Sequence, residues 1–276
     1  MREIINRINK FINKVADDHV SAYAAQSAFF LMLSLVPIIL LLMTLVRYTP
    51  ITQTDIIEAA NELFPKSIRA TIISIINEVY RQTGTTISIT VLMTLWSAGR
   101  GVLAISNGLN TIRGTKETRN YIMLRVRAAF YTVLFLLAII LSLVLLGFGN
   151  SISLLLNKHV PVIRYVLALI IKFRTVVMIL ILILFSISIY TFLPNKKGRF
   201  ITQIPGAIFN ALGWTLVSFL ISIYMDIFKG FSNVYGSLTT IVLIMLWLYF
   251  CMYIMLLGGV INNLLEERLD KSNENG

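Results

Sequence analysis

The amino-acid sequence predicts an all-α membrane protein, a polytopic helical bundle with six transmembrane helices that forms a single integral membrane domain over residues 1–276. Two properties of the composition support this prediction, because 57% of the residues are hydrophobic and only 13% are charged. The mean hydropathy of +0.81 agrees with them. A soluble domain carries roughly 25% charged residues, so the composition excludes a soluble enzyme, a disordered chain and a coiled coil.

The third observation is the length of the apolar stretches. A transmembrane helix needs about 20 apolar residues to cross roughly 30 Å of hydrocarbon. The predicted spans cover about residues 24–46, 87–105, 128–147, 176–193, 204–227 and 238–261. Residues 1–20 lack an uninterrupted apolar core and a small-residue cleavage site, so no cleavable signal peptide is expected. Pro37 and Pro205-Gly206 mark candidate breaks in the first and fifth spans.

The segment before the first span has the pattern of an amphipathic helix. Apolar residues recur at helical spacing and basic residues take the other positions. The apolar residues are Ile4, Ile5, Ile8, Phe11, Ile12 and Val15, and the basic ones are Arg2, Arg7, Lys10 and Lys14. The pattern fits both a helix that lies on the membrane surface and a helix that packs against the bundle.

The connection between the first two spans, residues 47–86, is too long to be a plain loop. It contains two short amphipathic patterns separated by Phe64-Pro65, and Asp55 with Glu58 resembles a helix start. We therefore expect a helical outer loop. This loop forms either a lid over the outer face or a structural cap that seals the bundle.

The basic residues predict the orientation of the spans. The chain has 24 Lys+Arg against 13 Asp+Glu, and in a membrane protein this net charge of +11 is first an orientation signal. If both termini are cytoplasmic, that side collects Arg2, Arg7, Lys10, Lys14, Arg113, Lys116, Arg119, Arg125, Arg127, Lys196, Lys197, Arg199, Arg268 and Lys271. Short cytoplasmic loops rich in Lys and Arg satisfy the positive-inside rule, so we place both termini in the cytoplasm.

Arg100 is the clearest candidate for a functional residue, because an ionisable side chain inside a span is energetically costly. It borders a face of small residues at helical spacing, and Asn107 lies two turns further along. The small residues are Ser97, Gly101, Ala104 and Gly108. Arg100 either contacts an anionic ligand or extends to the cytoplasmic headgroups.

The fifth span carries a second polar series at four-residue spacing, which begins with Asn210 and Trp214 and ends at Asp226. Its serines, Ser218 and Ser222, are expected to make interhelical hydrogen bonds. Candidate partners for Asp226 are Lys172 and Arg174, before the fourth span. These charges either line an outward vestibule that attracts anions or are simply solvated. Ala207 and Ala211 would also permit close packing of the second and fifth spans.

Several motifs in this order resemble the YihY/BrkB family of bacterial inner-membrane proteins, over most of the chain. They are Ala24-Ala25-Gln26-Ser27-Ala28-Phe29-Phe30, Leu33-Ser34-Leu35-Val36-Pro37, Trp96-Ser97-Ala98-Gly99-Arg100, Asn107, Asn110, Tyr190, Leu193-Pro194, Pro205-Gly206-Ala207, Trp214, Tyr224, Tyr235-Gly236-Ser237, Trp247-Leu248-Tyr249, Leu257-Gly258-Gly259 and Asn262. Gln26 departs from the family pattern, which usually has an aliphatic residue or Ala there. The resemblance implies a multi-pass protein of the bacterial plasma membrane, associated with envelope or serum-resistance phenotypes and suspected of transport.

Some family members have carried a ribonuclease label, but the residues here do not favour it. The two histidines, His19 and His159, are predicted on opposite sides of the membrane. The sequence shows no metal-ligand spacing, and Asp17-Asp18-His19 is typical of a solvated helix end. It also shows no phosphate-binding glycine-rich loop. We therefore predict no enzyme activity, no metal, no cofactor and no nucleic-acid partner.

The leading hypothesis is a protein that transports or flips an amphipathic or anionic envelope substrate, with membrane lipids as its surroundings. Arg100 would contact the anion, and the second and fifth spans would flank the path. The alternative is a non-transporting scaffold that organises envelope proteins or lipids through its outer loop and basic loops. No oligomeric state is predicted.

Overall fold

Every described element of the chain is helical, which confirms the all-α prediction. The computed structural model describes residues 2–46, 53–54, 57–58, 73–74, 76–77, 80–81, 84–147, 173–227 and 237–274. The helices are α1 (Arg2–Asp17), α2 (Val20–Val46), α5 (Gly84–Ile112), α6 (Tyr121–Gly147), α9 (Arg174–Phe192), α10 (Ile204–Ile227) and α12 (Ser237–Glu274), with the 3-10 helix η1 (Phe200–Gln203) between α9 and α10.

Three of the described helices contain stretches long and apolar enough to cross a membrane, in α9, α10 and α12. The stretches are Thr175–Phe192, Phe200–Tyr224, which includes η1, and Ile241–Asp270, and they match the fourth, fifth and sixth predicted spans. The first three predicted spans lie within α2, α5 and α6. The chain is therefore a helical membrane protein, while the number of six spans and the single domain stay predictions.

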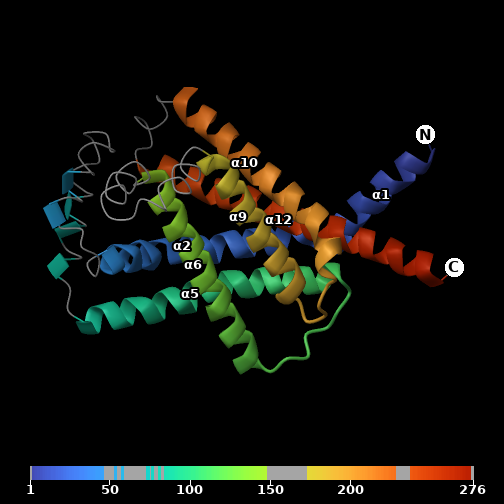
Figure 1. The fold of residues 1–276 in the computed structure, drawn as a ribbon, viewed down its shortest axis with the longest axis horizontal. Helices are drawn as coiled ribbons and strands as arrows, with labels where there is room; N and C mark the ends of the chain where they lie inside the picture. The colour runs from blue at the N-terminus through green and yellow to red at the C-terminus, as the bar shows by residue number, and fades with distance from the viewer. Residues whose placement is uncertain are drawn as a thin grey trace, which may run out of the picture.

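The small residues of α5 pack against α2. A Cβ atom on Gly101 would lie 3.0 Å from Leu31 Cγ, and one on Gly108 would lie 3.0 Å from the Cβ of Tyr23. A larger residue at either position would have to displace the facing side chain, so glycine favours this close approach of the two helices. Figure 1 shows α2 and α5 side by side along most of their length. The predicted close-packing face of α5 is confirmed, and its main partner is α2.

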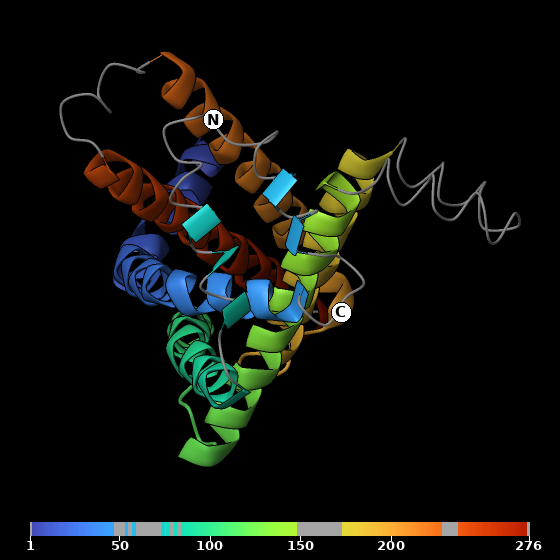
Figure 2. The ribbon, with the colours of Figure 1, turned by 90° about the vertical axis from the view of Figure 1, so that its left-hand side faces the viewer.

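The small residues of α10 pack against α12, and not against α5 as Ala207 and Ala211 would also have permitted. Gly206 touches Gly258 so closely that a Cβ on either residue would collide with the other's backbone. Ala207 and Ala211 are fully buried. Helices α5 and α10 lie on opposite sides of α12 (Figures 1 and 2). The small-residue face of α5 packs against α2 and that of α10 packs against α12, so the two faces do not pack against each other.

The two termini and two connections lie at one end of the bundle, which we call the terminal end (Figure 1). These connections are residues 113–120, between α5 and α6, and residues 193–203, between α9 and α10. This arrangement agrees with a shared side for both termini. The assignment of that side to the cytoplasm stays a prediction.

Helix α1 is tied to the bundle through its second half. Phe11 and Val15 pack against the core, and Lys10 Nζ lies 3.1 Å from the Glu267 carboxylate of α12. Ile12, in contrast, is 55% exposed. This part of α1 therefore packs against the bundle and still presents an apolar side chain to its surroundings. His19 adopts a left-handed conformation (φ 50°) in the turn before α2, so Asp17-Asp18-His19 forms a helix end.

The described residues of the predicted outer loop are helical, at 53–54, 57–58, 73–74, 76–77 and 80–81. Gln53 Nε2 donates a hydrogen bond to Asn77 Oδ1 at 2.7 Å, and this bond joins the two amphipathic patterns. The choice between a lid and a cap concerns mainly residues outside the described ranges, and it stays open.

Candidate functional site

Arg100 faces the perimeter of the bundle. Its side chain is exposed, and its guanidinium carbon lies 5.5 Å from the ring centroid of Phe30 and 5.8 Å from that of Trp96. It makes no ion pair with a described residue. The predicted residue therefore sits on an aromatic surface, with its positive charge unneutralised by the described part of the protein.

A second arginine, Arg125 of α6, shares the same tryptophan. Its guanidinium carbon lies 4.4 Å from the Trp96 ring centroid and 5.0 Å from that of Tyr121. Its Nε atom donates to Tyr121 Oη at 2.8 Å, whereas its Nη1 atom is buried and has no hydrogen-bond partner among the described residues. We call Phe30, Trp96, Arg100, Tyr121 and Arg125 the Trp96 cluster.

The path of the chain explains how α6 brings Arg125 to Trp96. Trp96 lies about 24 Å along α5 from Ile112, at 1.5 Å per residue. Figure 1 shows the connection after Ile112 running back along α5 before α6 begins. Helix α6 then crosses α5 at Gly99, where a Cβ would lie 3.7 Å from the Cβ of Ala128. Arg125 is one turn before Ala128 and so reaches the perimeter of α5 near Trp96.

The exposed face of α5 changes character at this cluster. Ile89, Leu92, Met93 and Trp96 are exposed hydrophobic residues, between 54% and 67% accessible. The next exposed positions towards the terminal end are polar, at Arg100 and Asn107. A tryptophan beside arginines at an apolar-to-polar boundary is typical of the membrane–water interface.

Asn107 is not part of the cluster. Its side chain is exposed about 10 Å further along α5, at 1.5 Å per residue. Its backbone carbonyl accepts a hydrogen bond from Thr111 Oγ1 at 3.0 Å. Asn107 therefore lies two turns along the helix from Arg100, as predicted, but no described contact links the two side chains.

Asn210 and Trp214 lie on α10 and are not part of the Trp96 cluster. Asn210 is fully buried, and its Nδ2 donates to Ser186 Oγ of α9 at 2.8 Å, while its Oδ1 has no partner. The Trp214 ring packs edge-on against Trp247 at 5.7 Å. Trp247 Nε1 donates to Ser218 Oγ at 3.0 Å, which confirms the expected interhelical role of Ser218.

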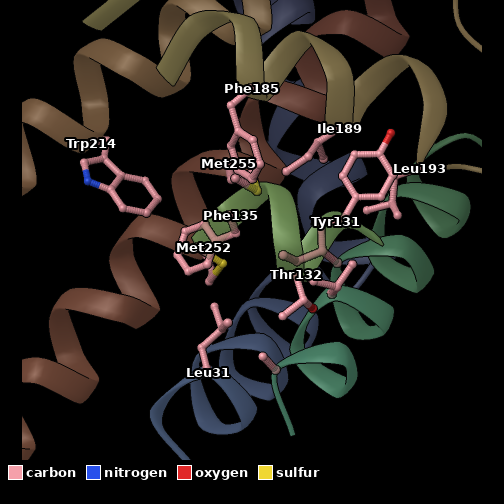
Figure 3. Close-up of a pocket in the computed structure, with 13 residues that line it drawn as sticks. Leu31, Tyr131, Thr132, Phe135, Phe185, Ile189, Leu193, Trp214, Met252 and Met255 are labelled. Atoms are coloured by element: carbon pink, nitrogen blue, oxygen red, sulfur yellow. The ribbon is translucent and has the colours of Figure 1, made fainter. Parts of the chain in front are cut away.

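An apolar cavity of about 30 Å³ lies where six helices meet (Figure 3). Leu31, Phe135, Phe185, Trp214 and Met252 are among the side chains that line it. This volume is about that of one water molecule, and its walls offer almost no polar group. This cavity therefore has no room for a charged headgroup in this conformation.

The side chains of the remaining predicted site residues, Lys172, Arg174 and Asp226, are not described by the structure. Lys172 lies outside the described residues. Arg174 and Asp226 are described as helical backbone, near the start of α9 and the end of α10, without their side chains. The outward vestibule of Lys172, Arg174 and Asp226 stays a prediction.

Sequence reasoning missed that three arginines converge on the C-terminal end of α9. Arg113 Nη2 donates a hydrogen bond to the Tyr190 carbonyl at 2.9 Å, and Arg127 Nη1 donates one to the Phe192 carbonyl at 2.9 Å. Both Nη atoms of Arg119 donate to the Leu193 carbonyl at 3.1 Å. The last carbonyls of a helix lack intrahelical partners and carry negative partial charge. These arginines therefore also cap a helix, beyond their expected part in orientation.

Glu117 orients one of these arginines. Its two oxygens accept from Arg119 Nε at 2.7 Å and Nη2 at 2.6 Å, and Asn110 Nδ2 adds a bond of 2.9 Å. The bonds from Arg119 hold the pKa of the Glu117 carboxyl at about 2, below its ordinary value. Burial lowers the pKa of Arg113, and Glu266 opposes this effect. Both groups lie in the connection after α5 and serve structure at the terminal end.

The described residues contain no group of three or more His, Cys, Asp or Glu side chains placed to hold a metal ion. The candidate site is thus a cationic and aromatic surface.

Comparisons with known proteins agree with this membrane architecture. The ribonuclease-like protein YfkH of Bacillus subtilis (strain 168) is 32% identical over 253 residues, which cover 91% of this chain and 92% of that protein. The UPF0761 membrane protein PSHAa0171 of Pseudoalteromonas translucida (strain TAC 125) is 24% identical over 255 residues, covering 91% and 82%. No solved structure matches the chain. Residues 11–276 match the family described as Virulence factor BrkB, and the chain belongs to this family of membrane proteins.

Proposed function

We propose that this protein binds an anionic amphiphile of the bacterial envelope and moves its headgroup along the perimeter of the helical bundle. The observation that carries the proposal is the Trp96 cluster, where Arg100 and Arg125 share one indole ring without an ion pair to a described residue. Two unneutralised guanidinium groups at an apolar-to-polar boundary favour an anionic headgroup whose chains stay in lipid.

The perimeter is a better path than the interior. The interior cavity of about 30 Å³ is apolar, so an anion there would lose its hydration without compensation. At the cluster, in contrast, the headgroup keeps contact with water and arginine while the acyl chains lie against exposed side chains such as Leu92 and Met93. The proposed headgroup contact is therefore at the Trp96 cluster on the perimeter of α5, and not between the second and fifth spans.

The name of the relative YfkH suggests a ribonuclease-like reaction for that protein. We assign no residue of this chain to such a reaction, because the described residues offer no cluster of His, Cys, Asp or Glu that could activate water through a metal. Cations on an apolar surface match an amphiphile better than a nucleic acid.

The test is lipid movement in reconstituted vesicles. Fluorescent phosphatidylglycerol, placed in one leaflet, should become accessible in the other faster than in protein-free vesicles, and labelled phosphatidylcholine should not. Arg100→Ala should slow this movement by about tenfold or more, the usual effect of losing a charge-assisted hydrogen bond, and Arg100→Lys should slow it less. Lys116→Gln is the control, since it removes an exposed positive charge from the connection before α6.

A scaffold gives a different set of results. Well-folded protein that leaves lipid movement at the protein-free rate would contradict transport. If deletion of residues 50–83 then abolished capture of envelope partners while the bundle still folded, the scaffold function would replace it. Full activity of Arg100→Ala at a normal protein level would remove Arg100 from the mechanism.

A further inference from the structure

The Trp96 cluster contains an electrostatic arrangement that the protein leaves incomplete. The guanidinium carbons of Arg100 and Arg125 lie 5.8 and 4.4 Å from the same ring centroid, so they are at most about 10 Å apart. Cation–π attraction holds each of them near the ring, but the two like charges repel. No carboxylate of a described residue pairs with either group. An anion between them would remove this repulsion.

One donor of Arg125 is already withdrawn from solvent. Its Nη1 atom is buried and has no acceptor, although the neighbouring Nε atom is satisfied by Tyr121 Oη at 2.8 Å. A buried donor of a charged group without an acceptor is costly, and native structures rarely tolerate it without a reason. The guanidinium carbon lies 4.4 Å from the Trp96 ring centroid, so an anion that uses this donor would lie beside Trp96 and would require the guanidinium to turn until Nη1 is accessible.

The geometry discriminates between classes of anion. A carboxylate is planar and pairs best with one arginine, whose two parallel donors bind both of its oxygens side by side. Here the donors come from two helices and approach one ring separately, with Arg100 on α5 and Arg125 on α6. A phosphate group presents oxygens in several directions. With hydrogen bonds of 2.7–2.9 Å it bridges two guanidinium carbons up to about 8 Å apart, so the two groups must lie nearer to each other than their upper limit of about 10 Å when they share a phosphate.

We infer that Arg100 and Arg125 form a two-helix clamp for the phosphate group of a membrane lipid, with Trp96 as the apolar floor between them. This inference rests on the proposed function and names the ligand class of the same site. The exposed Leu92, Met93 and Phe29 leave apolar surface beside the clamp for an acyl chain. A phosphate group bound by both arginines would also connect α6 to α5, in addition to the contact between Gly99 and Ala128.

Trp96 itself reports on binding. The chain has three tryptophans, and the other two, Trp214 and Trp247, pack against each other away from the cluster. The double substitution Trp214→Phe and Trp247→Phe leaves Trp96 as the single fluorophore of the full-length protein in detergent micelles. Titration with short-chain phosphatidic acid should then change the Trp96 emission in a saturable way.

Three variants in this background test the clamp. Arg125→Gln should weaken the apparent affinity for short-chain phosphatidic acid by about 10- to 100-fold, the usual effect of losing a hydrogen bond from a charged group. Arg125→Lys should fall between Arg125→Gln and the unmodified clamp, because it keeps the charge and loses the planar fork. Lys116→Gln should bind as the unmodified clamp does. Equal weakening by Lys116→Gln and Arg125→Gln would reduce the effect to general surface attraction and overturn the inference.

The choice of probe separates the possible ligands. A fatty acid of the same chain length, an uncharged diacylglycerol and inorganic phosphate should all bind more weakly than phosphatidic acid. A fatty acid that binds equally well would overturn the phosphate assignment, and inorganic phosphate that binds equally well would overturn the lipid assignment. If the double tryptophan variant does not fold, native mass spectrometry measures the same difference, because it counts phosphatidic acid bound to unmodified protein and to Arg125→Gln.

The experiments distinguish failure of the phosphate clamp from failure of the proposed transport. Saturable binding that depends on Arg125, in a protein that moves no lipid, would support the clamp and contradict the proposed transport. Lipid movement that persists in Arg125→Gln, without a phosphate-dependent Trp96 signal, would contradict the clamp and leave transport standing.

Discussion

Asn262 of α12 holds the first turn of α10 in place. Its Oδ1 accepts the Gly206 N–H at 2.7 Å, and its Nδ2 donates to the Gln203 carbonyl at 3.2 Å. Asn262 is fully buried, so water cannot replace either bond. The Gly206 N–H is one of the donors that a helix start leaves without an intrahelical partner. Asn262→Ala should therefore leave the Gly206 N–H buried and unpaired, whereas the Gln203 carbonyl keeps the first intrahelical bond of α10.

The expected loss of stability follows from the Gly206 N–H. An unsatisfied buried donor costs about 1–3 kcal/mol, so Asn262→Ala should lower the free energy of unfolding by about 1–3 kcal/mol. Equilibrium unfolding in mixed detergent micelles measures this quantity. The neighbouring Asn263→Ala is the matched control, because Asn263 is only partly buried and its Nδ2 donates to Glu267 of its own helix. Equal losses in the two variants would refute the capping role of Asn262.

Two further predictions concern the pH dependence of stability and the closest helix contact. The pKa of Glu117, about 2 against an ordinary 4.5, means that its bonds with Arg119 stabilise the fold fully above pH 4.5 and lose this effect as pH falls towards 2. We expect a loss of about 2–3 kcal/mol over that window in unfolding experiments, and a Glu117→Gln variant that loses as much would show another group to be responsible. Gly206→Ala should destabilise the bundle by about 1–3 kcal/mol or more, because its Cβ would meet the Gly258 backbone, which cannot rotate away. Gly99→Ala, whose Cβ would make an ordinary contact of 3.7 Å, should be neutral or stabilising, and the reverse order in thermal denaturation would contradict the packing.

Arg100 illustrates how far a single residue can be interpreted before its neighbours are placed. Its position in an apolar stretch is enough to select it as a candidate anion contact. Its actual neighbours are Phe30, 70 positions earlier in the chain, and a tryptophan that it shares with Arg125. The sequence marks Arg125 only as an orientation charge, because a count of charges does not reveal which residues a crossing helix brings together.

The arginines at the end of α9 show the same limit. Arg113, Arg119 and Arg127 all follow the second span in a basic segment, and the positive-inside rule accounts for their number. Their acceptors are carbonyls of Tyr190, Phe192 and Leu193, more than 60 residues away. No local pattern encodes this capping, since the carbonyls become available only where α9 ends beside the returning chain.

Composition and apolar run length were sufficient for the helical membrane architecture, because a bilayer requires each crossing segment to satisfy its own backbone and to be apolar over a defined length. Small residues at four-residue spacing likewise identified the faces of α5 and α10 that pack closely. The sequence did not reveal which helices pack against these faces. Several helices could pack against each small-residue face. In the structure α2 packs against the face of α5 and α12 against that of α10, because the arrangement of the whole bundle places them there. The same geometry brought Arg100 and Arg125 to one tryptophan, so the candidate site exists only once α6 has crossed α5.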